Sequence, residues 1–213
     1  MKTIIIAVRH GYSEANLTQT FTGNTDSPLI EQGFLQAKLS ADYLKDFPID
    51  IIYSSDLKRA YDTAVEISKI TGLKINKTEK LREIYGGKWE GIPFSEIAVK
   101  YTEQYNIWRN DIGKCTLGGG ESVKEFFDRI KNAVFDIIKN NEGKTICIAT
   151  HATPIRVLRT VSLDKTADDL NDIPWCANAS ISIFEYENGK LNTINYGITE
   201  HLGDNITTIP KTI

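Results

Sequence analysis

The stretch Ile4-Ile5-Ile6-Ala7-Val8-Arg9-His10-Gly11 decides how this chain folds. Its first five residues are β-branched or small and apolar, which is typical of a buried strand in a parallel sheet. Arg9 and His10 follow at the carboxyl end of that strand, where open α/β sheets bind their ligands. An arginine beside a histidine at such a point favours an anion held next to a nucleophile or proton carrier. A capped strand end with an exposed histidine is the alternative interpretation.

A second apolar strand ends in the same way. Residues 144–149 predict a buried strand, and Thr150 and His151 follow it. We expect Thr153 to be the N-cap of the next helix, with Pro154 at its first position. His151 then lies just before a helix N-terminus, where free backbone N–H groups and the helix dipole attract anions. The chain has three histidines, and two of them close apolar strands, which favours a functional site.

A third cation, Arg59, stands at the beginning of a predicted helix. The strand expected over 49–53 leads into Ser54-Ser55-Asp56-Leu57-Lys58-Arg59-Ala60, and apolar residues then recur with helical spacing up to Gly72. A positive charge in the first helical turn opposes the helix dipole, and acidic residues are the usual choice there. A bound anion would reverse that cost, so we interpret Arg59 as an anion ligand. A solvated surface pair with Lys58 is the alternative.

Strands and helices alternate along the chain. Asn188-Gly189 lies between two alternating runs and predicts a hairpin, so the last two strands are expected to be antiparallel neighbours on an otherwise parallel sheet. Ser122 and Glu125 form a capping box ahead of an amphipathic helix. The expected strands are 3–8, 49–53, 73–77, 144–149, 179–186 and 191–196, and the expected helices are 30–46, 56–71, 94–109, 122–140 and 154–162.

Composition limits the partners and the location. The net charge is -3, hydrophobic residues make up 41% of the chain and charged residues 25%, as in ordinary soluble globular proteins. This charge gives no reason to expect nucleic acid or an anionic membrane as a partner. No apolar stretch is long enough to cross a membrane or to form a signal-peptide core. The three cysteines lack close pairing and predict reduced thiols, so we expect a cytoplasmic protein.

These residues resemble the histidine phosphatase superfamily in its phosphoglycerate mutase-like branch. The matching pieces follow the family order over nearly the whole chain, and they are specific jointly, although each alone is weak. They are Arg9-His10-Gly11 with Asn16, Phe21-Thr22-Gly23 through Asp26, Pro28-Leu29, Gly33, Ser54 to Ala60, Thr63-Ala64, Leu81, Glu83, Gly87, Trp89-Glu90-Gly91, Gly119-Gly120-Glu121-Ser122, Thr150-His151 and Asn178-Ala179-Ser180. The chain departs from the family at Ala152, where glycine is common, and at Ile30, where a capping Thr or Ser is common.

The resemblance implies a fold and a mechanism. The fold is a three-layer α/β/α arrangement with a mixed, mostly parallel six-stranded sheet. We expect one domain over 1–213, in which the excursion near 83–120 forms a lid over the strand ends. In the implied mechanism, His10 attacks the phosphoryl phosphorus and forms a phosphohistidine. Glu83 protonates the leaving oxygen and then takes a proton from the incoming water.

Other positions are expected to hold the substrate. The resemblance assigns the phosphoryl oxygens to Arg9, Arg59 and His151. Asn16 adds a neutral donor, and Ala152 still offers its backbone N–H. Thr22 and Gly23 match the family's substrate-binding loop. Because side chains supply the positive charge, no metal or cofactor is needed, and the sequence has neither an HxxxH nor a CxxC pattern.

The acid and the leaving-group side have rival candidates. Glu90 is the alternative acid, and the resemblance decides for Glu83 because Glu90 aligns with the family's Trp-Glu-Gly tail. Tyr85, Trp89 and Tyr101 either line the leaving-group side or pack in the core, and core packing is the more common role at such spacing.

Three functions use a site of this kind. The first is hydrolysis of a small phosphorylated metabolite, such as a sugar phosphate, a phosphoglycerate or α-ribazole phosphate. The second is a cofactor-dependent phosphoglycerate mutase, but the segment 84–91 looks like the phosphatase version and no Arg-Arg pair occurs. The third is a non-catalytic phospholigand-binding module, which would not need His10, Glu83 and His151 together. The sequence favours the phosphatase.

Overall fold

Six strands form one mixed sheet in the computed structural model, which describes residues 1–207. The expected domain extends to residue 213, and 208–213 lie outside the described residues. β1, β2, β3 and β4 run parallel, whereas β5 pairs antiparallel with β1 and with β6, so the predicted terminal hairpin is confirmed. The strands are β1 (Thr3–Arg9), β2 (Ile51–Ser55), β3 (Ile75–Thr78), β4 (Thr145–Thr150), β5 (Ile181–Glu187) and β6 (Lys190–Ile198), in the order β3-β2-β4-β1-β5-β6.

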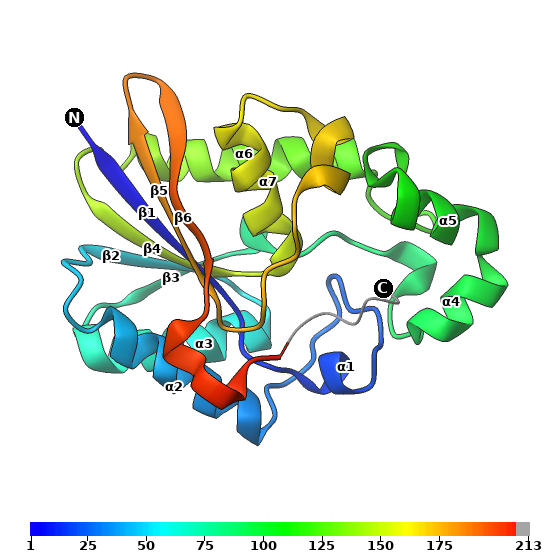
Figure 1. Cartoon of the computed structure of the whole chain (residues 1–213), viewed down its shortest axis with the longest axis horizontal. Helices are drawn as coiled ribbons and strands as arrows, with labels where there is room; N and C mark the ends of the chain where they lie inside the picture. The colour runs from blue at the N-terminus through cyan, green and yellow to red at the C-terminus, as the bar shows by residue number, and fades with distance from the viewer. Residues whose placement is uncertain (208–213) are drawn as a thin grey trace.

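Helices cover both faces of the sheet (Figure 1). On one face lie α2 (Glu31–Leu44) and α3 (Lys58–Thr71), and on the other α6 (Val123–Lys139) and α7 (Ala152–Ser162). The cause is the alternation of side chains along each strand. Ile6 and Val8 pack with apolar residues of α2 and α3, while Ile5 and Ala7 pack with those of α6 and α7. The expected three-layer α/β/α fold is confirmed.

The segment between β3 and α6 extends past the carboxyl ends of the strands (Figure 1). It contains α4 (Phe94–Lys100) and α5 (Thr102–Asn110). The expectation of one helix over 94–109 is wrong, because the backbone leaves the helical region at Tyr101 (φ -127°, ψ 42°). The kink allows Tyr101 and Tyr105 both to pack against the buried Trp89, with ring centroids 6.4 Å away in each case.

Helix starts are the other departure from expectation. α7 begins at Ala152 with His151 as its N-cap, so the prediction of Thr153 as N-cap is wrong. The Thr153 N–H instead donates to the carboxylate of Glu83 (3.0 Å), a partner that no local pattern reveals. The short helix α1 (Glu14–Leu17), with its own capping box, was not expected. The other expected helices and all six strands begin and end within two residues of their predicted bounds.

Two glycines bring the loop after β1 close to α2. A Cβ on Gly11 would lie 2.2 Å from the carbonyl oxygen of Gly33, and one on Gly33 would lie 2.0 Å from that of Tyr12. The Gly11 N–H also donates to the Thr63 hydroxyl of α3 (3.1 Å). Any side chain at Gly11 or Gly33 would therefore displace the loop that begins with His10.

The remaining compositional expectations concern cysteines and membranes. Cys115, Cys147 and Cys176 are all buried, and within residues 1–207 none of them forms a disulfide. No helix of the described chain combines the length and the apolar character that a membrane span requires.

Candidate active site

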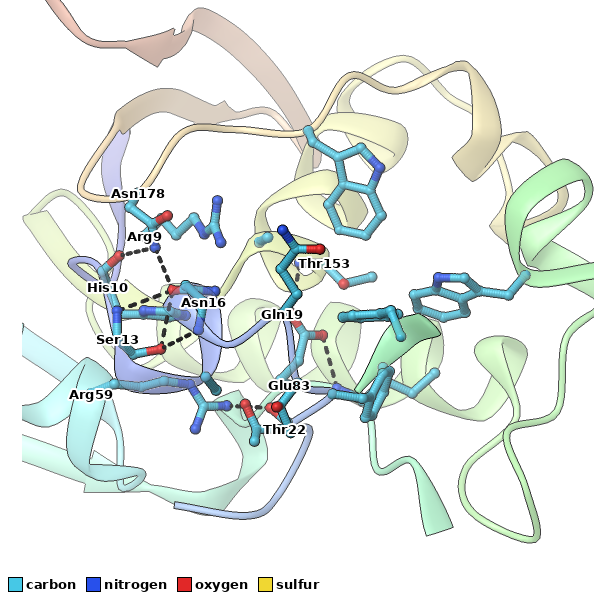
Figure 2. Close-up of a pocket in the computed structure, with 18 residues that line it drawn as sticks. Arg9, His10, Ser13, Asn16, Gln19, Thr22, Arg59, Glu83, Thr153 and Asn178 are labelled. Carbon is cyan, nitrogen blue, oxygen red and sulfur yellow. Dashed lines mark hydrogen bonds between the residues drawn. The ribbon is translucent and has the colours of Figure 1, made fainter. Parts of the chain in front are cut away.

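The site begins where β1 and β4 end side by side. The strands pair in register so that Arg9 lies opposite Thr150, and His10 and His151 are the next residues. The His10 N–H donates to the Thr150 carbonyl (2.9 Å), and the two imidazole centroids are 5.2 Å apart. Strand pairing thus brings together two histidines that lie far apart in the sequence. His10 lines a cleft at this end of the sheet (Figure 2).

Hydrogen bonding sets the tautomer of His10. Its Nδ1 lies 2.8 Å from the carbonyl oxygen of Gly11. Because a carbonyl only accepts, Nδ1 carries the proton and Nε2 is left unprotonated. Burial, together with the positive charges of Arg59 and Arg9, lowers the pKa of His10 well below its ordinary value. The ring is therefore neutral at neutral pH, with a lone pair on Nε2.

His151 is a second neutral imidazole. It is fully buried, and its Nε2 lies 2.9 Å from the hydroxyl of Ser55 at the end of β2. Its Nδ1 has no partner within the described residues. Burial and the charge of Arg59 lower its pKa well below the ordinary value. Ser55, which orients this ring, belongs to the motif Ser54 to Ala60, and nothing local in the sequence predicts its contact with His151.

Arg59 of α3 is held by backbone carbonyls. Its Nη2 donates to the oxygens of Thr22 (2.8 Å) and Gly23 (2.9 Å), and its Nη1 to that of Thr25 (3.0 Å). The side chain is 2% exposed, and burial lowers its pKa to about 10, so it stays protonated at neutral pH. A buried guanidinium bonded to neutral carbonyls keeps its full positive charge available to the cleft.

Arg9 is the second buried cation. Its Nη1 donates to the Cys176 carbonyl (2.6 Å), and its Nε has no partner in the described part of the chain. Burial lowers its pKa to about 10. Among residues 1–207, no carboxylate forms an ion pair with Arg9 or Arg59. Glu83 contributes a negative charge near both arginines, but neither has a carboxylate at ion-pair distance in the described chain, so a bound anion would supply the contact that buried charges usually have.

The other expected substrate-binding positions divide between the cleft and its support. Asn16, Thr22 and Ala152 line the cleft. The Asn16 amide oxygen accepts from three donors, among them the Asn178 amide (2.9 Å), and this orients its NH₂ group away from them. Gly23 is not among the described residues that line the cleft, and its role is the carbonyl that binds Arg59.

Glu83 lies in the cleft beside the first turn of α7. Its Oε2 accepts from the Thr153 N–H (3.0 Å) and its Oε1 from the Ile84 N–H (2.8 Å). Figure 2 shows the carboxylate next to Thr153, across the cleft from His10. A carboxyl group in this place can exchange a proton with an oxygen that departs from a phosphoryl group at His10.

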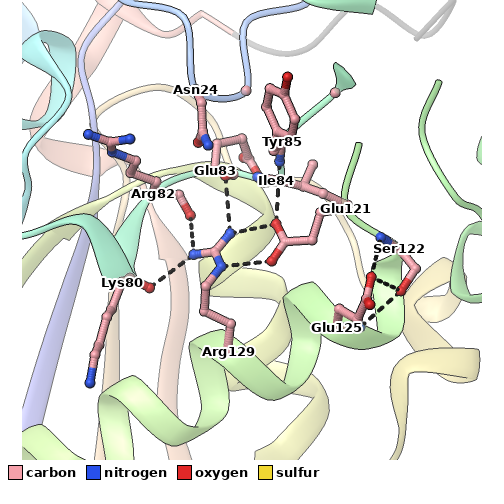
Figure 3. A network of polar contacts seen from close by, with 12 residues as sticks. Asn24, Lys80, Arg82, Glu83, Ile84, Tyr85, Glu121, Ser122, Glu125 and Arg129 are labelled. Carbon is pink, nitrogen blue, oxygen red and sulfur yellow. Dashed lines mark hydrogen bonds and ion pairs between the residues drawn. The ribbon is translucent and has the colours of Figure 1, made fainter. Parts of the chain in front are cut away.

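Arg129 of α6 clamps the segment that carries Glu83 (Figure 3). Its Nε and Nη2 form a bidentate pair with the carboxylate of Glu121 (2.8 and 2.7 Å). The same guanidinium donates to the carbonyls of Lys80, Arg82 and Glu83 at 3.0, 3.1 and 3.3 Å. This clamp was missed in the sequence, because nothing local connects α6 to the segment after β3.

Glu90, the alternative acid, supports the loop that holds Arg59. Its carboxylate accepts from the N–H groups of Asn24, Thr25 and Gly86 at 2.9 to 3.0 Å. It does not line the described cleft, so the geometry favours Glu83.

Aromatic residues line the far side of the cleft, but they are not Tyr85, Trp89 or Tyr101, the candidates that the sequence offered for this role. Trp89 is fully buried, and neither Tyr85 nor Tyr101 belongs to the described cleft lining. The rings that line it are Phe21, Phe94, Trp108 and Trp175. Sequence reasoning missed Trp175 because it lies in a loop without periodicity. Within residues 1–207, no three His, Cys, Asp or Glu side chains are grouped as metal ligands.

The third histidine lies away from the cleft. The Nε2 of His201 lies 3.1 Å from the Ser40 hydroxyl and 3.1 Å from the Ala179 carbonyl.

A neutral imidazole beside two buried arginines that lack an ion-pair partner in the described chain is an arrangement suited to binding a phosphoryl group. The family model of the histidine phosphatase superfamily (branch 1) matches residues 5–199. The chain belongs to this superfamily, and the resemblance in its motifs is confirmed.

Relatives and solved structures agree with this assignment. The chain is 34% identical over 203 residues to phosphoserine phosphatase 1 of Hydrogenobacter thermophilus, which covers 94% of each chain. It is 31% identical over 204 residues to the metal-independent phosphoserine phosphatase of Arabidopsis thaliana, covering 94% of this chain and 83% of that one. The solved structure of Bacillus stearothermophilus YhfR matches with a TM-score of 0.90 and 28% identity over 94% of this chain and 99% of that one. The chain is a metal-independent phosphatase of this superfamily.

Proposed function

We propose that the cleft hydrolyses phosphomonoesters of small alcohols through a phosphohistidine on His10. The observation that carries this proposal is the unprotonated Nε2 of His10 beside Arg9 and Arg59, two buried cations with no carboxylate partner in the described chain. A phosphoryl dianion would supply the missing negative charge and place its phosphorus next to Nε2.

In the first step, the Nε2 lone pair of His10 attacks phosphorus. The N–P bond forms while the bond between phosphorus and the alcohol oxygen breaks, and Glu83 gives its proton to that oxygen. Arg9, Arg59 and Asn16 hold the other oxygens. The bound dianion favours protonation of the neighbouring His151, which then becomes a further donor.

In the second step, water replaces the alcohol. Glu83, now ionised, takes a proton from the water as its oxygen attacks phosphorus. The N–P bond breaks, its electron pair returns to Nε2 of His10, and inorganic phosphate leaves. Both displacements use the same phosphoryl ligands, so the protein has to build only one charged site.

A rapid-quench experiment tests the nucleophile. With a ³²P-labelled phosphomonoester, the wild-type protein should give an acid-labile, alkali-stable phosphoenzyme, and His10→Asn should give none. His201→Asn is the matched control, because that ring lies outside the cleft, and it should still be labelled. Label in His10→Asn would assign the nucleophile elsewhere.

A further inference from the structure

The far side of the cleft is a row of four aromatic rings, here called the aromatic wall: Phe21, Phe94, Trp108 and Trp175. Phe94 and Trp175 are half-buried, whereas Phe21 and Trp108 are each 5% exposed. The ring centroids are 5.7 Å apart for Phe21 and Phe94, 6.1 Å for Phe21 and Trp108, and 6.4 Å for Trp108 and Trp175. These are contact distances for aromatic rings, so the wall is continuous and apolar.

Arg156 holds Trp175 in place from the protein interior. Its guanidinium carbon lies 3.9 Å from the Trp175 ring centroid. Its Nε and Nη2 donate to the carbonyls of Ile173 (3.0 Å) and Leu170. Arg156 is 2% exposed and is not part of the described cleft lining. The cation against Trp175 makes the ring rigid, and its positive charge disfavours a second cation on the same indole.

The charges of the cleft are already used by the proposed reaction. The charged side chains of its described lining are Arg9, Arg59 and Glu83. The two arginines hold the phosphoryl group and Glu83 carries the proton. In the described lining, no further charge remains for a carboxylate or an ammonium group on the alcohol, and burying such a group without a partner is costly.

Neutral hydrogen-bonding groups lie between the phosphoryl site and the aromatic wall. Gln19 and Thr153 line the cleft, and Figure 2 shows both near its middle. Gln19 adopts φ 53°, and its carbonyl accepts the Phe94 N–H (3.0 Å) at the wall. A left-handed conformation is uncommon for a residue other than glycine and persists where the surroundings hold it. The cleft thus offers an amide and a hydroxyl near the rings, and the charge beside Thr153 is the Glu83 carboxylate that the proposed reaction uses.

We propose that this phosphatase selects esters of uncharged alcohols that carry a flat apolar ring, and that Phe94 and Trp175 are the residues that select them. The proposal rests on the proposed function and names its substrate class. The proposed preference distinguishes this chain from an enzyme that hydrolyses amino-acid phosphates. The ammonium and carboxylate groups of such substrates would lie against the aromatic wall without a partner of opposite charge.

The test compares kcat/KM of the wild-type protein for five alkyl phosphates. The ring-bearing ester is 2-phenylethyl phosphate, and ethyl phosphate lacks the ring. O-phospho-L-serine, 3-phosphoglycerate and choline phosphate carry additional charges. We expect 2-phenylethyl phosphate to exceed ethyl phosphate by about tenfold or more and to exceed every charged ester. A charged ester that equals or exceeds 2-phenylethyl phosphate would overturn the proposal.

Variants then identify the selecting residues. Trp175→Ala should lower the ratio of kcat/KM for 2-phenylethyl phosphate to that for ethyl phosphate by about tenfold, whereas Trp175→Phe, which keeps a ring, should change it less than about threefold. Tyr85→Ala is the matched control, because Tyr85 is 43% exposed and lies outside the described cleft lining. An unchanged ratio in both Trp175→Ala and Phe94→Ala would overturn the assignment. If neither variant folds, the ranking of the five esters by kcat/KM of the wild-type protein tests the proposal.

Labelling of His10 distinguishes a failure of the proposed substrate class from a failure of the proposed function on which it rests. If His10 is labelled but a charged ester is preferred, the substrate class is wrong and the phosphatase mechanism stands. If no ester labels His10, the mechanism fails and the substrate class fails with it. Gln19→Lys adds the missing cation and should raise kcat/KM for 3-phosphoglycerate relative to 2-phenylethyl phosphate.

Discussion

The two ends of the cleft are built by different parts of the chain and by different physical means. The phosphoryl end comes from the carboxyl ends of β1 and β4 and from the first turns of α3 and α7, and backbone carbonyls hold its cations. The aromatic wall comes from loops and from α4 and α5, and ring contacts hold it. In the proposed function, the reaction and the choice of alcohol are therefore carried by separate elements, so one can change without the other.

The two ends also contribute to stability with opposite signs. The phosphoryl end buries two arginines without carboxylate partners in the described chain and keeps two histidines neutral, which costs folding free energy until an anion binds. The aromatic wall removes apolar surface from water and stabilises the fold. A bound phosphoryl group offsets the cost at the first end and leaves the second unchanged.

The largest expected loss of rate comes from a substitution that alters only the phosphoryl end of the cleft. Arg59→Ala removes a cation that, in the proposed reaction, contacts the ester only through its phosphoryl oxygens, which are the same in every ester. The single-turnover rate of phosphorylation should fall roughly 1,000-fold for alkyl and nitrophenyl phosphates alike. Quenched-flow measurement with both esters checks this. A defect confined to one ester would show that Arg59 contacts the alcohol instead.

The next effect distinguishes Glu83 from the phosphoryl ligands. An alkoxide needs a proton to leave, whereas nitrophenolate leaves largely unaided. Glu83→Gln should slow phosphorylation by ethyl phosphate roughly 100-fold or more, and by nitrophenyl phosphate less than about tenfold. The first-turnover burst must be measured, because Glu83 is also the proposed base of the hydrolysis step. Equal burst defects with both esters would remove Glu83 from the acid role.

A smaller effect concerns the clamp behind Glu83. Arg129→Ala removes a guanidinium that bonds the Glu83 carbonyl and the Glu121 carboxylate. The rate with ethyl phosphate should fall about tenfold, with a smaller loss for nitrophenyl phosphate, since a 1 Å misplacement of a catalytic group is costly. Glu121→Gln keeps the shape of the partner of Arg129, so it should lower the rate with ethyl phosphate less than Arg129→Ala does. Uniform losses for the two esters would indicate a general structural role in place of positioning.

The smallest effect measures the folding cost of the phosphoryl end. Unfolded histidines titrate near 6.5, whereas the pKa values of His10 and His151 are lowered in the fold, by burial first. Below pH 6.5 the unfolded chain binds more protons, so the free energy of unfolding falls as the pH falls, by at most about 1.4 kcal/mol per pH unit for each histidine.

Urea unfolding at pH 7.5 and 5.5 in phosphate-free buffer checks that effect. The wild-type protein should lose more stability between these pH values than a His10→Asn/His151→Asn double variant. Equal losses would mean that the two histidines are not held neutral by the fold.

The sequence by itself determined the elements and the phosphoryl end in outline. Alternating apolar runs with turn residues predict the six strands, and Arg9, His10, Arg59 and His151 stand directly at strand ends and helix starts. In a parallel sheet those ends must meet at one edge, so local position predicts a shared site. The family resemblance added Glu83, which no local pattern distinguishes from Glu90.

The tertiary structure alone decided how those groups are oriented and what surrounds them. The Gly11 carbonyl that sets the His10 tautomer is local, but Ser55 on His151, the carbonyls on Arg59 and the Arg129 clamp join distant segments. The same holds for the aromatic wall, which draws one ring from each of four segments. Such contacts depend on how helices and loops pack around the sheet, and periodicity reports only which face of an element is buried, not which distant residue meets it.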